Sequence, residues 1–459
     1  MSSAGLETSE NPVLSFVSLG CPKNVVDGEN MLGKLVENGW YLSSEPEEAD
    51  VIVVNTCSFI ESARQESIEQ IRQMAEFKTS GRCRGLVVSG CLAQRYGEAL
   101  LKDLPEVDAL LGVSRIQDID ALCRGLLGKK GNSRNPDIRI SDPDDLDQTY
   151  RVRLRIGAPH FAYLKISEGC NQKCTFCAIP SFRGKLKSRP IEAVVAEARD
   201  LVAAGAREII LISQDSTSYG RDRYGARRLP DLCRELARID GLEWLRIMYH
   251  YPTSYPMELL DEIAANDKIV KYIDIPLQHI NDDVLFRMKR GINRRKIEEL
   301  LGRMREKIPG LAIRTTLIVG FPGETEEQFE EMHEFVQATR FDRLGVFTYS
   351  VEASTPSGSM PDQVPQEVKD RRRERIMRSQ QKIAFARNRE CVGTTRKILI
   401  DRLDENGKQY IGRSYADAPE IDNLVYVRAP RKGALEVGKF YPVHLQRSLG
   451  YDLSGSVVE

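Results

Sequence analysis

Short apolar runs alternate with amphipathic stretches over the first 120 residues. The runs VLSFVSLGC, VIVVNTC and GLVVSGC each end on a cysteine, and a fourth run covers Asp108–Val113. Helical patterns lie between them, for example Val25–Asn38 and Glu61–Phe77. Because short apolar strands joined by helices are typical of parallel sheets, the pattern predicts a parallel α/β domain over residues 12–127.

A second series of apolar runs begins at Phe161. Helical patterns such as Ile191–Ala204 and Glu326–Ala338 separate its members. Six β/α units are too few for a closed eight-stranded barrel, so we expect an open (β/α)6 partial barrel of the TIM type over residues 156–391. The six predicted strands are Phe161–Ile166, Glu208–Ile212, Glu243–Met248, Tyr272–Pro276, Ala312–Val319 and Gly345–Tyr349.

The remaining segments are a predicted linker and a predicted small barrel. Residues 128–155 are rich in Gly, Asn, Asp and Pro, which is typical of a linker or exposed loop. A charged helix is expected at Gln366–Cys391. After it, the runs RKILID, QYIGRS, NLVYVRA and YPVHLQ are separated by turn residues. This spacing predicts a small antiparallel β-barrel over residues 392–459.

Composition narrows the class of protein. A chain of 459 residues exceeds what one hydrophobic core usually holds, and 41% hydrophobic residues with 29% charged residues exclude global disorder. A net charge of -1 disfavours a protein that coats a polyanion. No run approaches 18 apolar residues, and the first twelve residues lack an apolar signal core, so we expect a cytoplasmic protein with no membrane contact. Ten cysteines are too few for a disulfide scaffold, which leaves metal ligands or reactive thiols.

The strongest local signal is the run Cys170-Asn-Gln-Lys-Cys174-Thr-Phe-Cys177, which directly follows the first strand of the second series. Ligand sites in β/α folds lie at the carboxyl ends of strands. Three thiolates are one short of a closed zinc site, and His160 is the nearby candidate for a fourth ligand. An iron–sulfur cluster on three cysteines instead leaves one iron open. A zinc-stapled adaptor remains an alternative at this point.

Three further cysteines, Cys21, Cys57 and Cys91, each follow a predicted strand of the first domain. The carboxyl ends of neighbouring parallel strands meet at one edge, so we expect these thiols to share one cluster. Gly20 and Gly90 would let the backbone approach that cluster closely. The alternative is ordinary packing of buried cysteines. We expect no site role for Cys83, Cys123, Cys233 and Cys391.

These motifs resemble a known family. CNQKCTFC, with Phe176 before its last cysteine, is similar to the CxxxCxxC motif of radical S-adenosylmethionine (SAM) enzymes. SLGCPKNVVDGE, NTCSFIESAR, SGCLAQRY and IVGFPGETEE resemble segments of the methylthiotransferases within that group, and the likeness covers nearly the whole chain. It implies a [4Fe–4S] cluster on each triad, SAM bound to the cluster of Cys170, Cys174 and Cys177, and a C-terminal TRAM-like barrel.

The resemblance also suggests residues that contact SAM. Gln214 and Asp215 follow the second strand of the radical SAM domain, where they could hydrogen-bond the amino group of SAM; alternatively they cap the next helix. In IVGFPGETEE, Gly320, Pro322 and Gly323 would bring the backbone close to the adenosyl group. The alternative there is an ordinary turn in which Thr325 caps the following helix.

Three other features stay open. The run KDRRRERIMR is either a solvated charged face or a contact with ribosomal or transfer RNA. His250 and His279 lie near strand ends and either bind substrate or pack within the core. A non-catalytic iron–sulfur electron carrier or sensor with an RNA-binding barrel is an alternative of another class.

The family divides by substrate, and three features favour one branch. Some members modify an adenosine of transfer RNA, and others modify the β-carbon of an aspartate of small-subunit ribosomal protein twelve. SLGCPKN and YADAPEIDN look like the ribosomal-protein branch. Residues 391–459 carry ten basic and nine acidic residues, which is weak for binding phosphate. We expect Asp417, Glu420 and Asp422 to dock the basic ribosomal protein, with an electron donor and a sulfur source as further partners.

Overall fold

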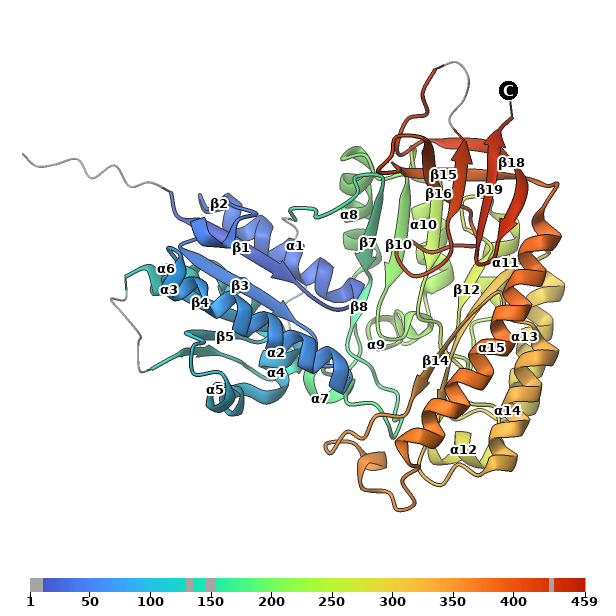
Figure 1. The fold of residues 1–459 in the computed structure, drawn as a ribbon, viewed down its shortest axis with the longest axis horizontal. Helices are drawn as coiled ribbons and strands as arrows, with labels where there is room; N and C mark the ends of the chain where they lie inside the picture. Colours follow the sequence, from blue (N-terminus) through green and yellow to red (C-terminus); the bar gives the residue numbers. More distant parts are fainter. Residues whose placement is uncertain (1–10, 129–134, 146–152, 429–432, 459) are drawn as a thin grey trace, which may run out of the picture. The chain divides into compact units, whose positions relative to one another are not determined.

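The computed structural model describes residues 11–128, 135–145, 153–428 and 433–458. The chain forms two compact units (Figure 1). Unit 1 comprises Met1–Ile156 and Ala178–Lys185, and unit 2 comprises Gly157–Cys177 and Leu186–Glu459. In the described part of the chain, no helix is long and apolar enough to span a bilayer.

Unit 1 contains a six-stranded parallel sheet, as predicted for this domain, in the order β2-β1-β3-β4-β5-β6. The sequence analysis missed both edge strands, because they are too short or too polar to form an apolar run. One of them, β6, lies in the predicted linker, of which residues 129–134 and 146–152 lie outside the described residues. The strands are β1 (Val13–Ser18), β2 (Tyr41–Leu42), β3 (Val51–Thr56), β4 (Gly85–Gly90), β5 (Ala109–Leu111) and β6 (Asp137–Arg139).

Both faces of this sheet are buried. Val51 and Val53 of β3 pack into one apolar cluster with α1 and α6, whereas Ile52 and Val54 pack into a second cluster on the opposite face. Burial on both faces explains the unbroken apolar runs of the central strands. The helices are α1 (Pro22–Glu37), α2 (Glu61–Ala75), α3 (Phe77–Ser80), α4 (Cys91–Tyr96), α5 (Leu100–Asp103), α6 (Ile119–Leu127) and α7 (Ile179–Arg183).

Unit 2 begins with six parallel strands in two groups of three, β11-β10-β7 and β12-β13-β14. A bridge between Leu245 and Ile269 joins the two groups, which gives the predicted open six-stranded arrangement. The short hairpin of β8 (Ser167–Glu168) and β9 (Lys187–Ser188) flanks it. The six strands are β7 (Phe161–Lys165), β10 (Glu208–Ile212), β11 (Trp244–Ile247), β12 (Tyr272–Asp274), β13 (Ala312–Val319) and β14 (Arg343–Thr348).

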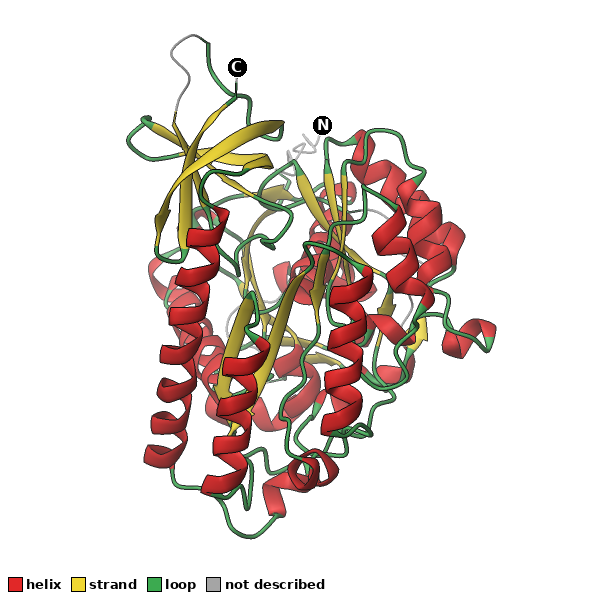
Figure 2. Ribbon diagram, turned by 90° about the vertical axis from the view of Figure 1, so that its right-hand side faces the viewer, coloured by secondary structure: helices red, strands yellow, loops and turns green. Residues whose placement is uncertain are grey.

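Helices cover the outside of these strands and lead into the C-terminal barrel (Figure 2). The long α15 (Gln366–Cys391) has the predicted bounds and packs against α14 and β14. The other helices are α8 (Ile191–Ala203), α9 (Arg221–Tyr224), α10 (Leu229–Ala237), α11 (Glu258–Ala265), α12 (Asp282–Arg287), α13 (Arg294–Lys307) and α14 (Glu326–Thr339).

The C-terminal strands close into a five-stranded barrel in the order β15-β16-β17-β19-β18. Four neighbouring pairs are antiparallel, but β17 and β19 are parallel. The expectation of a purely antiparallel barrel was therefore wrong at this seam, because an odd number of strands cannot alternate in direction all the way round. The strands are β15 (Thr395–Leu403), β16 (Gln409–Arg413), β17 (Val425–Arg428), β18 (Phe440–Leu449) and β19 (Asp452–Val457).

Buried ion pairs join this barrel to the six-stranded core of unit 2. Glu208 at the start of β10 accepts hydrogen bonds from Arg246 at 2.7 Å and from Arg413 of the barrel at 2.8 Å. Arg413 also contacts Asp401, which pairs with His160 at 2.8 Å. His160 is thus committed to the barrel and is not a fourth ligand for the Cys170 loop.

Candidate functional site

The three N-terminal cysteines follow adjacent strands in register. Ser18 of β1 pairs with Asn55 of β3, and Thr56 of β3 pairs with Gly90 of β4. Cys57 and Cys91 therefore come directly after paired residues, and Cys21 is the N-cap of α1. The sheet brings these three thiols to one edge, as the pattern of strand ends predicted.

Gly20 and Gly90 make this close approach possible. Both have a positive φ, +93° and +90°. A Cβ on Gly20 would lie 2.7 Å from Cys57 Cβ and 3.2 Å from its sulfur, and a Cβ on Gly90 would lie 2.6 Å from Asn55 Oδ1. Contacts under 3.0 Å are not tolerated, so these two positions require glycine for both backbone and space.

A buried arginine contacts the third thiol of this triad. Arg183 donates hydrogen bonds to Cys91 Sγ at 3.1 and 3.3 Å, to Asn24 Oδ1 at 2.5 Å and to Asp27 at 2.7 Å. Asn24 in turn donates to the backbone oxygens of Leu19 and Thr56, which come shortly before Cys21 and Cys57 in the chain. The arginine and Asn24 thus connect all three cysteine-bearing loops.

The buried environment of these thiols disfavours their ionisation to thiolates. Burial raises the pKa of Cys91 to about 12, although the Arg183 charge acts in the opposite direction. Burial also raises the pKa of Cys57, and the neighbouring Cys21 adds to that shift. Thiols that influence one another's ionisation share one small volume, and binding a cation there would require their protons to leave.

The second triad lies in the loop that follows β7 and β8. Cys177 N donates to Cys174 O, and Gln172 N lies 3.4 Å from Cys170 Sγ, so the loop folds back on itself. Thr175 ties it to the end of α12 through Met288 O and Arg287 O, at 3.1 and 2.9 Å. Burial raises the pKa of Cys170 to about 12.

Cys174 also has a cationic neighbour. Arg290 Nη1 lies 3.3 Å from Cys174 Sγ, and the hydroxyl of Tyr251 lies 3.5 Å from the same sulfur. The guanidinium stacks over the Tyr251 ring at 4.2 Å. The sequence analysis did not single out Arg290, Arg183 or Asn24, because each makes its contact with residues more than 60 positions away.

Several buried polar atoms near the carboxyl ends of β7, β10, β11 and β12 lack a hydrogen-bond partner. Each belongs to a residue within five positions of the end of its strand. Buried polar atoms are nearly always paired, so this set has hydrogen-bonding capacity for a polar ligand or for water. The atoms are Ser167 Oγ, Gln214 Oε1, His250 Nε2, Gln278 Oε1 and His279 Nε2.

Gln214 and Asp215 differ in whether their side-chain oxygens already have hydrogen-bond partners. The Gln214 amide donates to Glu168, while its oxygen has no partner. Asp215 accepts four hydrogen bonds, from Ser218 N, Thr217 Oγ1, Ser218 Oγ and Gln172 Nε2. A carboxylate has about four acceptor positions, and in this structure protein groups occupy those of Asp215. Asp215 caps the next helical turn and holds the cysteine loop through Gln172, and its contact with SAM stays a prediction.

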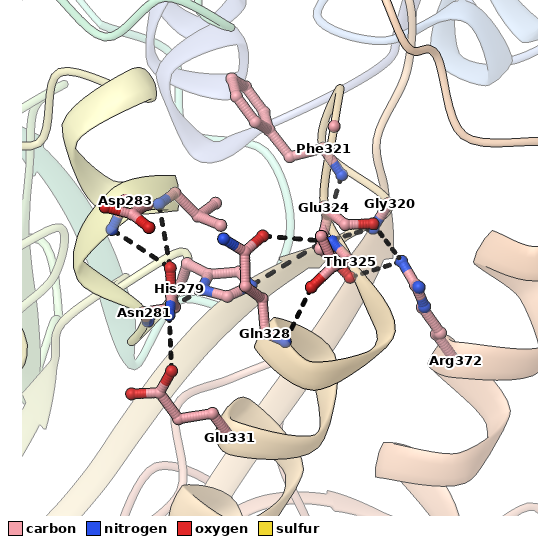
Figure 3. A network of polar contacts seen from close by, with 12 residues as sticks. His279, Asn281, Asp283, Gly320, Phe321, Glu324, Thr325, Gln328, Glu331 and Arg372 are labelled. Carbon is pink, nitrogen blue, oxygen red and sulfur yellow. Dashed lines mark hydrogen bonds and ion pairs between the residues drawn. The ribbon is translucent and has the colours of Figure 1, made fainter.

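The GFPGE loop after β13 is organised by Glu324 (Figure 3). This buried carboxylate accepts from Gly320 N at 2.8 Å and Phe321 N at 3.2 Å, and it pairs with Arg372 of α15 at 2.9 Å. His279 lies 3.7 Å from it. Thr325 and Gln328 form a capping box at the start of α14, which is the alternative foreseen for this turn.

The space beside the two glycines of this loop is already filled. A Cβ on Gly320 would lie 2.3 Å from Lys369, and one on Gly323 would lie 2.7 Å from Arg287, which also donates to Pro322 O. These distances concern an added Cβ beside flexible side chains, so the close approach of a ligand at Gly320 and Gly323 stays a prediction. Phe176 packs with Phe321 and Tyr349 in the adjacent apolar cluster.

Two of the three acidic residues expected to dock a partner are internal. Asp417 is 3% exposed and pairs with Arg343, and the Asp422 carboxylate accepts from Tyr272 at 2.7 Å and faces Arg314. Burial raises the pKa of Asp422. These carboxylates fasten the barrel to the core and leave little surface for a partner, and their docking role stays a prediction. Only Glu420 of the three is exposed.

Half of the basic residues in the run KDRRRERIMR of α15 contact other elements of unit 2. Lys369 donates to Tyr349 O at 2.9 Å, and Arg372 and Arg375 pair with glutamates of the GFPGE loop and of α14. Lys369 and Arg372 are therefore buried and stabilise the fold, whereas the other four basic residues of the run are exposed: Arg371, Arg373, Arg375 and Arg378. His250 is hydrogen-bonded to Tyr255, and burial lowers its pKa to about 4.

The remaining cysteines show no site of their own. Cys83, Cys123 and Cys233 are buried in apolar clusters, and Cys391 packs against the barrel core. All ten cysteines are free thiols. Within the described ranges, no three His, Cys, Asp or Glu side chains are placed to hold a single metal ion.

Family models match the three parts of the chain. Residues 164–336 match the radical SAM superfamily, residues 392–458 match the TRAM domain, and residues 14–112 match the uncharacterized protein family UPF0004. Among solved structures, the fold resembles the radical S-adenosylmethionine methyltransferase TsrM from Kitasatospora setae. That likeness has a TM-score of 0.55 and 16% identity over 76% of this chain and 74% of that chain, so it concerns the fold alone.

Curated relatives match along nearly the whole chain. The ribosomal protein uS12 methylthiotransferase RimO of Geobacter sulfurreducens is 46% identical over 97% of this chain and 98% of its own. The protein of the same name from Desulfitobacterium hafniense is 44% identical over 98% and 99%. That from Caldanaerobacter subterraneus is 47% identical over 96% and 99%. The chain therefore belongs to the family of ribosomal protein uS12 methylthiotransferases named RimO.

Proposed function

We propose that this protein transfers a methylthio group to the β-carbon of an aspartate of ribosomal protein uS12. The observation that carries the proposal is identity of 43–47% with the uS12 methylthiotransferases over nearly their whole length, in a chain with two cysteine triads at strand ends. The hydrogens on the β-carbon of an aspartate are too weakly acidic for ordinary base catalysis, so a carbon radical is the plausible route to the C–S bond.

The two triads are suited to hold [4Fe–4S] clusters. We assign Cys21, Cys57 and Cys91 to one cluster and Cys170, Cys174 and Cys177 to the other. The glycine cradle beside Cys57 and the buried arginine beside each triad fit a bulky anionic group. When bound, a cluster with an open iron and SAM supply one-electron chemistry that breaks unactivated C–H bonds.

Residues at the strand ends would hold SAM. We assign this role to the unpartnered atoms of Ser167, Gln214 and Gln278, because a ligand with amino, carboxylate and hydroxyl groups would satisfy them. Asp215 holds the cysteine loop in position, and Glu324 keeps the GFPGE loop rigid. Phe176, Pro322 and the glycines shape the wall of the site without offering polar contacts.

The exposed positive charge of the barrel favours contact with the ribosome. Three of its acidic residues, Asp401, Asp417 and Asp422, are neutralised by arginines inside unit 2, so the exposed surface is more basic than the sequence count suggests. We assign these exposed basic residues to contact with ribosomal RNA, with an external electron donor and sulfur source completing the reaction. They are Arg402, Lys408, Arg428, Lys439 and Arg447.

The proposal is tested in cells that lack this protein. Mass spectrometry of uS12 should show the loss of one methylthio mass on one aspartate. Complementation with the unmodified chain or with Cys391→Ala should restore it, whereas Cys174→Ala should not. Cys391 is a matched control because it is a half-buried cysteine outside both triads. If the mass persists on uS12 and a methylthio group disappears from a transfer-RNA adenosine, the substrate assignment is wrong.

A further inference from the structure

Arg290 is a buried cation with few partners. Its residue is 4% exposed. The guanidinium donates to Pro276 O at 2.6 Å and to Cys174 Sγ at 3.3 Å, and its Nε has no partner. One face lies on the Tyr251 ring. The positive charge is thus enclosed by protein and directed at a sulfur.

No carboxylate among the described residues forms an ion pair with Arg290, in contrast to the other buried arginines. Arg246 and Arg413 pair with Glu208, and Arg183 pairs with Asp27. Asp215 acts on Arg290 through its charge, but its acceptor positions are filled by other groups. An uncompensated buried cation costs several kcal/mol, so this position requires an anion that the side chains do not provide.

The backbone holds Arg290 in this place. Helix α12 ends in a Schellman motif, in which Arg290 N donates to Leu285 O at 3.0 Å and Lys289 N donates to Phe286 O at 2.9 Å. Lys289 adopts a left-handed φ of +53°, which is unfavourable for a non-glycine residue. The carbonyl of Arg290 accepts from Thr253 at 2.7 Å. The strain is maintained by surrounding contacts, as at many functional positions.

The cysteine loop is fastened to the same helix end. Thr175, between Cys174 and Cys177, binds the backbone oxygens of Arg287 and Met288. The sulfur and the guanidinium therefore sit on two segments that are locked together, so their separation is set by the fold rather than by a flexible side chain.

We propose that Arg290 is the counter-charge of the cluster bound at Cys174, and that it raises the reduction potential of this cluster. The inference rests on the proposed function, because it takes a cluster on the Cys170–Cys174–Cys177 triad as given. A cluster held by three thiolates carries negative charge, and reduction adds one more electron. A fixed cation in a water-poor site stabilises the reduced form more than the oxidised form.

Arg183 provides an internal control. It also donates to a triad sulfur, on Cys91, but Asp27 neutralises it at 2.7 Å. Replacing Arg183 by Gln should leave the cluster of the Cys174 triad unaffected. Arg290→Gln removes a charge that no carboxylate compensates. Arg290→Lys keeps the positive charge but loses the planar guanidinium group.

The experiment is a redox titration of the full-length protein with both clusters loaded and without SAM, followed by electron paramagnetic resonance. The chain with Cys21, Cys57 and Cys91 changed to Ala assigns the signals. For Arg290→Gln we expect about a tenfold lower ratio of reduced to oxidised cluster at a given potential, which is about 59 mV for one electron. Arg290→Lys should recover most of the shift, and Arg183→Gln should show none at this cluster.

Iron content separates the possible failures. If the unmodified chain binds no iron at this triad, the proposed function fails. If Arg290→Gln holds normal iron and the midpoint potential of the cluster is unchanged, the present inference fails. It also fails if the only change is a lower affinity for SAM. Loss of iron from Arg290→Gln but not from Arg290→Lys supports a required counter-charge. Loss from both variants assigns Arg290 to folding of the loop and overturns the inference.

Discussion

Replacing Glu208 by Gln should loosen the barrel from the core of unit 2. Glu208 is fully buried, and its two oxygens accept hydrogen bonds from Arg246 and Arg413 at 2.7 and 2.8 Å. Arg413 keeps Asp401 as a second partner, but Arg246 loses the only carboxylate with which it forms an ion pair among the described residues. Removing one member of a buried ion pair typically costs about 3–5 kcal/mol, because the other charge stays buried.

Glu243→Gln is the matched control. Glu243 also pairs with a barrel residue, Lys397 at 2.8 Å, but both side chains are about half exposed. An exposed pair contributes about 0–1 kcal/mol, so this variant should behave almost like the unmodified chain. Both variants replace a glutamate by glutamine, but Glu208 is buried whereas Glu243 is about half exposed.

Trp244 reports on this junction. Its ring lies against Phe440 of the barrel, with centroids 4.7 Å apart. The chain has two tryptophans, and Trp40 lies in unit 1, so a Trp40→Phe background isolates the signal. Urea unfolding followed by Trp244 fluorescence should show a clearly lower midpoint for Glu208→Gln than for Glu243→Gln. Equal midpoints would refute the argument that the buried charges hold the barrel in place.

The effect should depend on pH in a defined direction. Burial alone would raise the pKa of Glu208, but the charges of Arg413 and Arg246 lower it overall below the ordinary value of 4.5. A carboxyl group whose pKa is lowered on folding stabilises the protein above its unfolded pKa and loses that contribution as the pH falls through the folded value. The difference between the unmodified chain and Glu208→Gln should therefore be constant from pH 7 to 5 and should shrink below pH 4.5.

Three further predictions concern the cysteine triads. Changing Cys170, Cys174 and Cys177 together to Ala should leave about half of the iron, as measured by iron assay; loss of all or none would contradict two separate sites. Changing Cys21, Cys57 and Cys91 should preserve SAM cleavage but abolish methylthio product, and normal product formation would exclude the N-terminal cluster from the chemistry. Gly20→Ala places a Cβ 2.7 Å from Cys57 Cβ at a φ of +93°, so it should cost about 2–5 kcal/mol and reduce iron in unit 1. Gly157→Ala, with a φ of +88° and open space, should show only the backbone cost, and equal effects of the two would contradict the steric argument.

Local sequence pattern determined most of the fold and the location of both triads. The central strands are buried on both faces, so their apolar runs are unbroken, and the cysteines follow directly where each run ends. Neighbouring parallel strands share an edge, which is why Cys21, Cys57 and Cys91 could be grouped although they lie more than 30 positions apart. The charged stretch was expected to form a helix over Gln366–Cys391, and α15 has these bounds. The short edge strands β2 and β6 carried no such signal.

What only the tertiary structure decided was the partner of each charged and polar group. Asp417 and Asp422 looked like an exposed acidic patch, yet they pair with Arg343 and Arg314 from distant strands. Asp215 looked like a ligand, yet its oxygens are filled by its own turn and by Gln172. Arg183 and Arg290 looked ordinary and lie against the two triads. Apolar periodicity is a local property of the chain, whereas the partner of a buried charge is set by segments that meet only when the chain has folded.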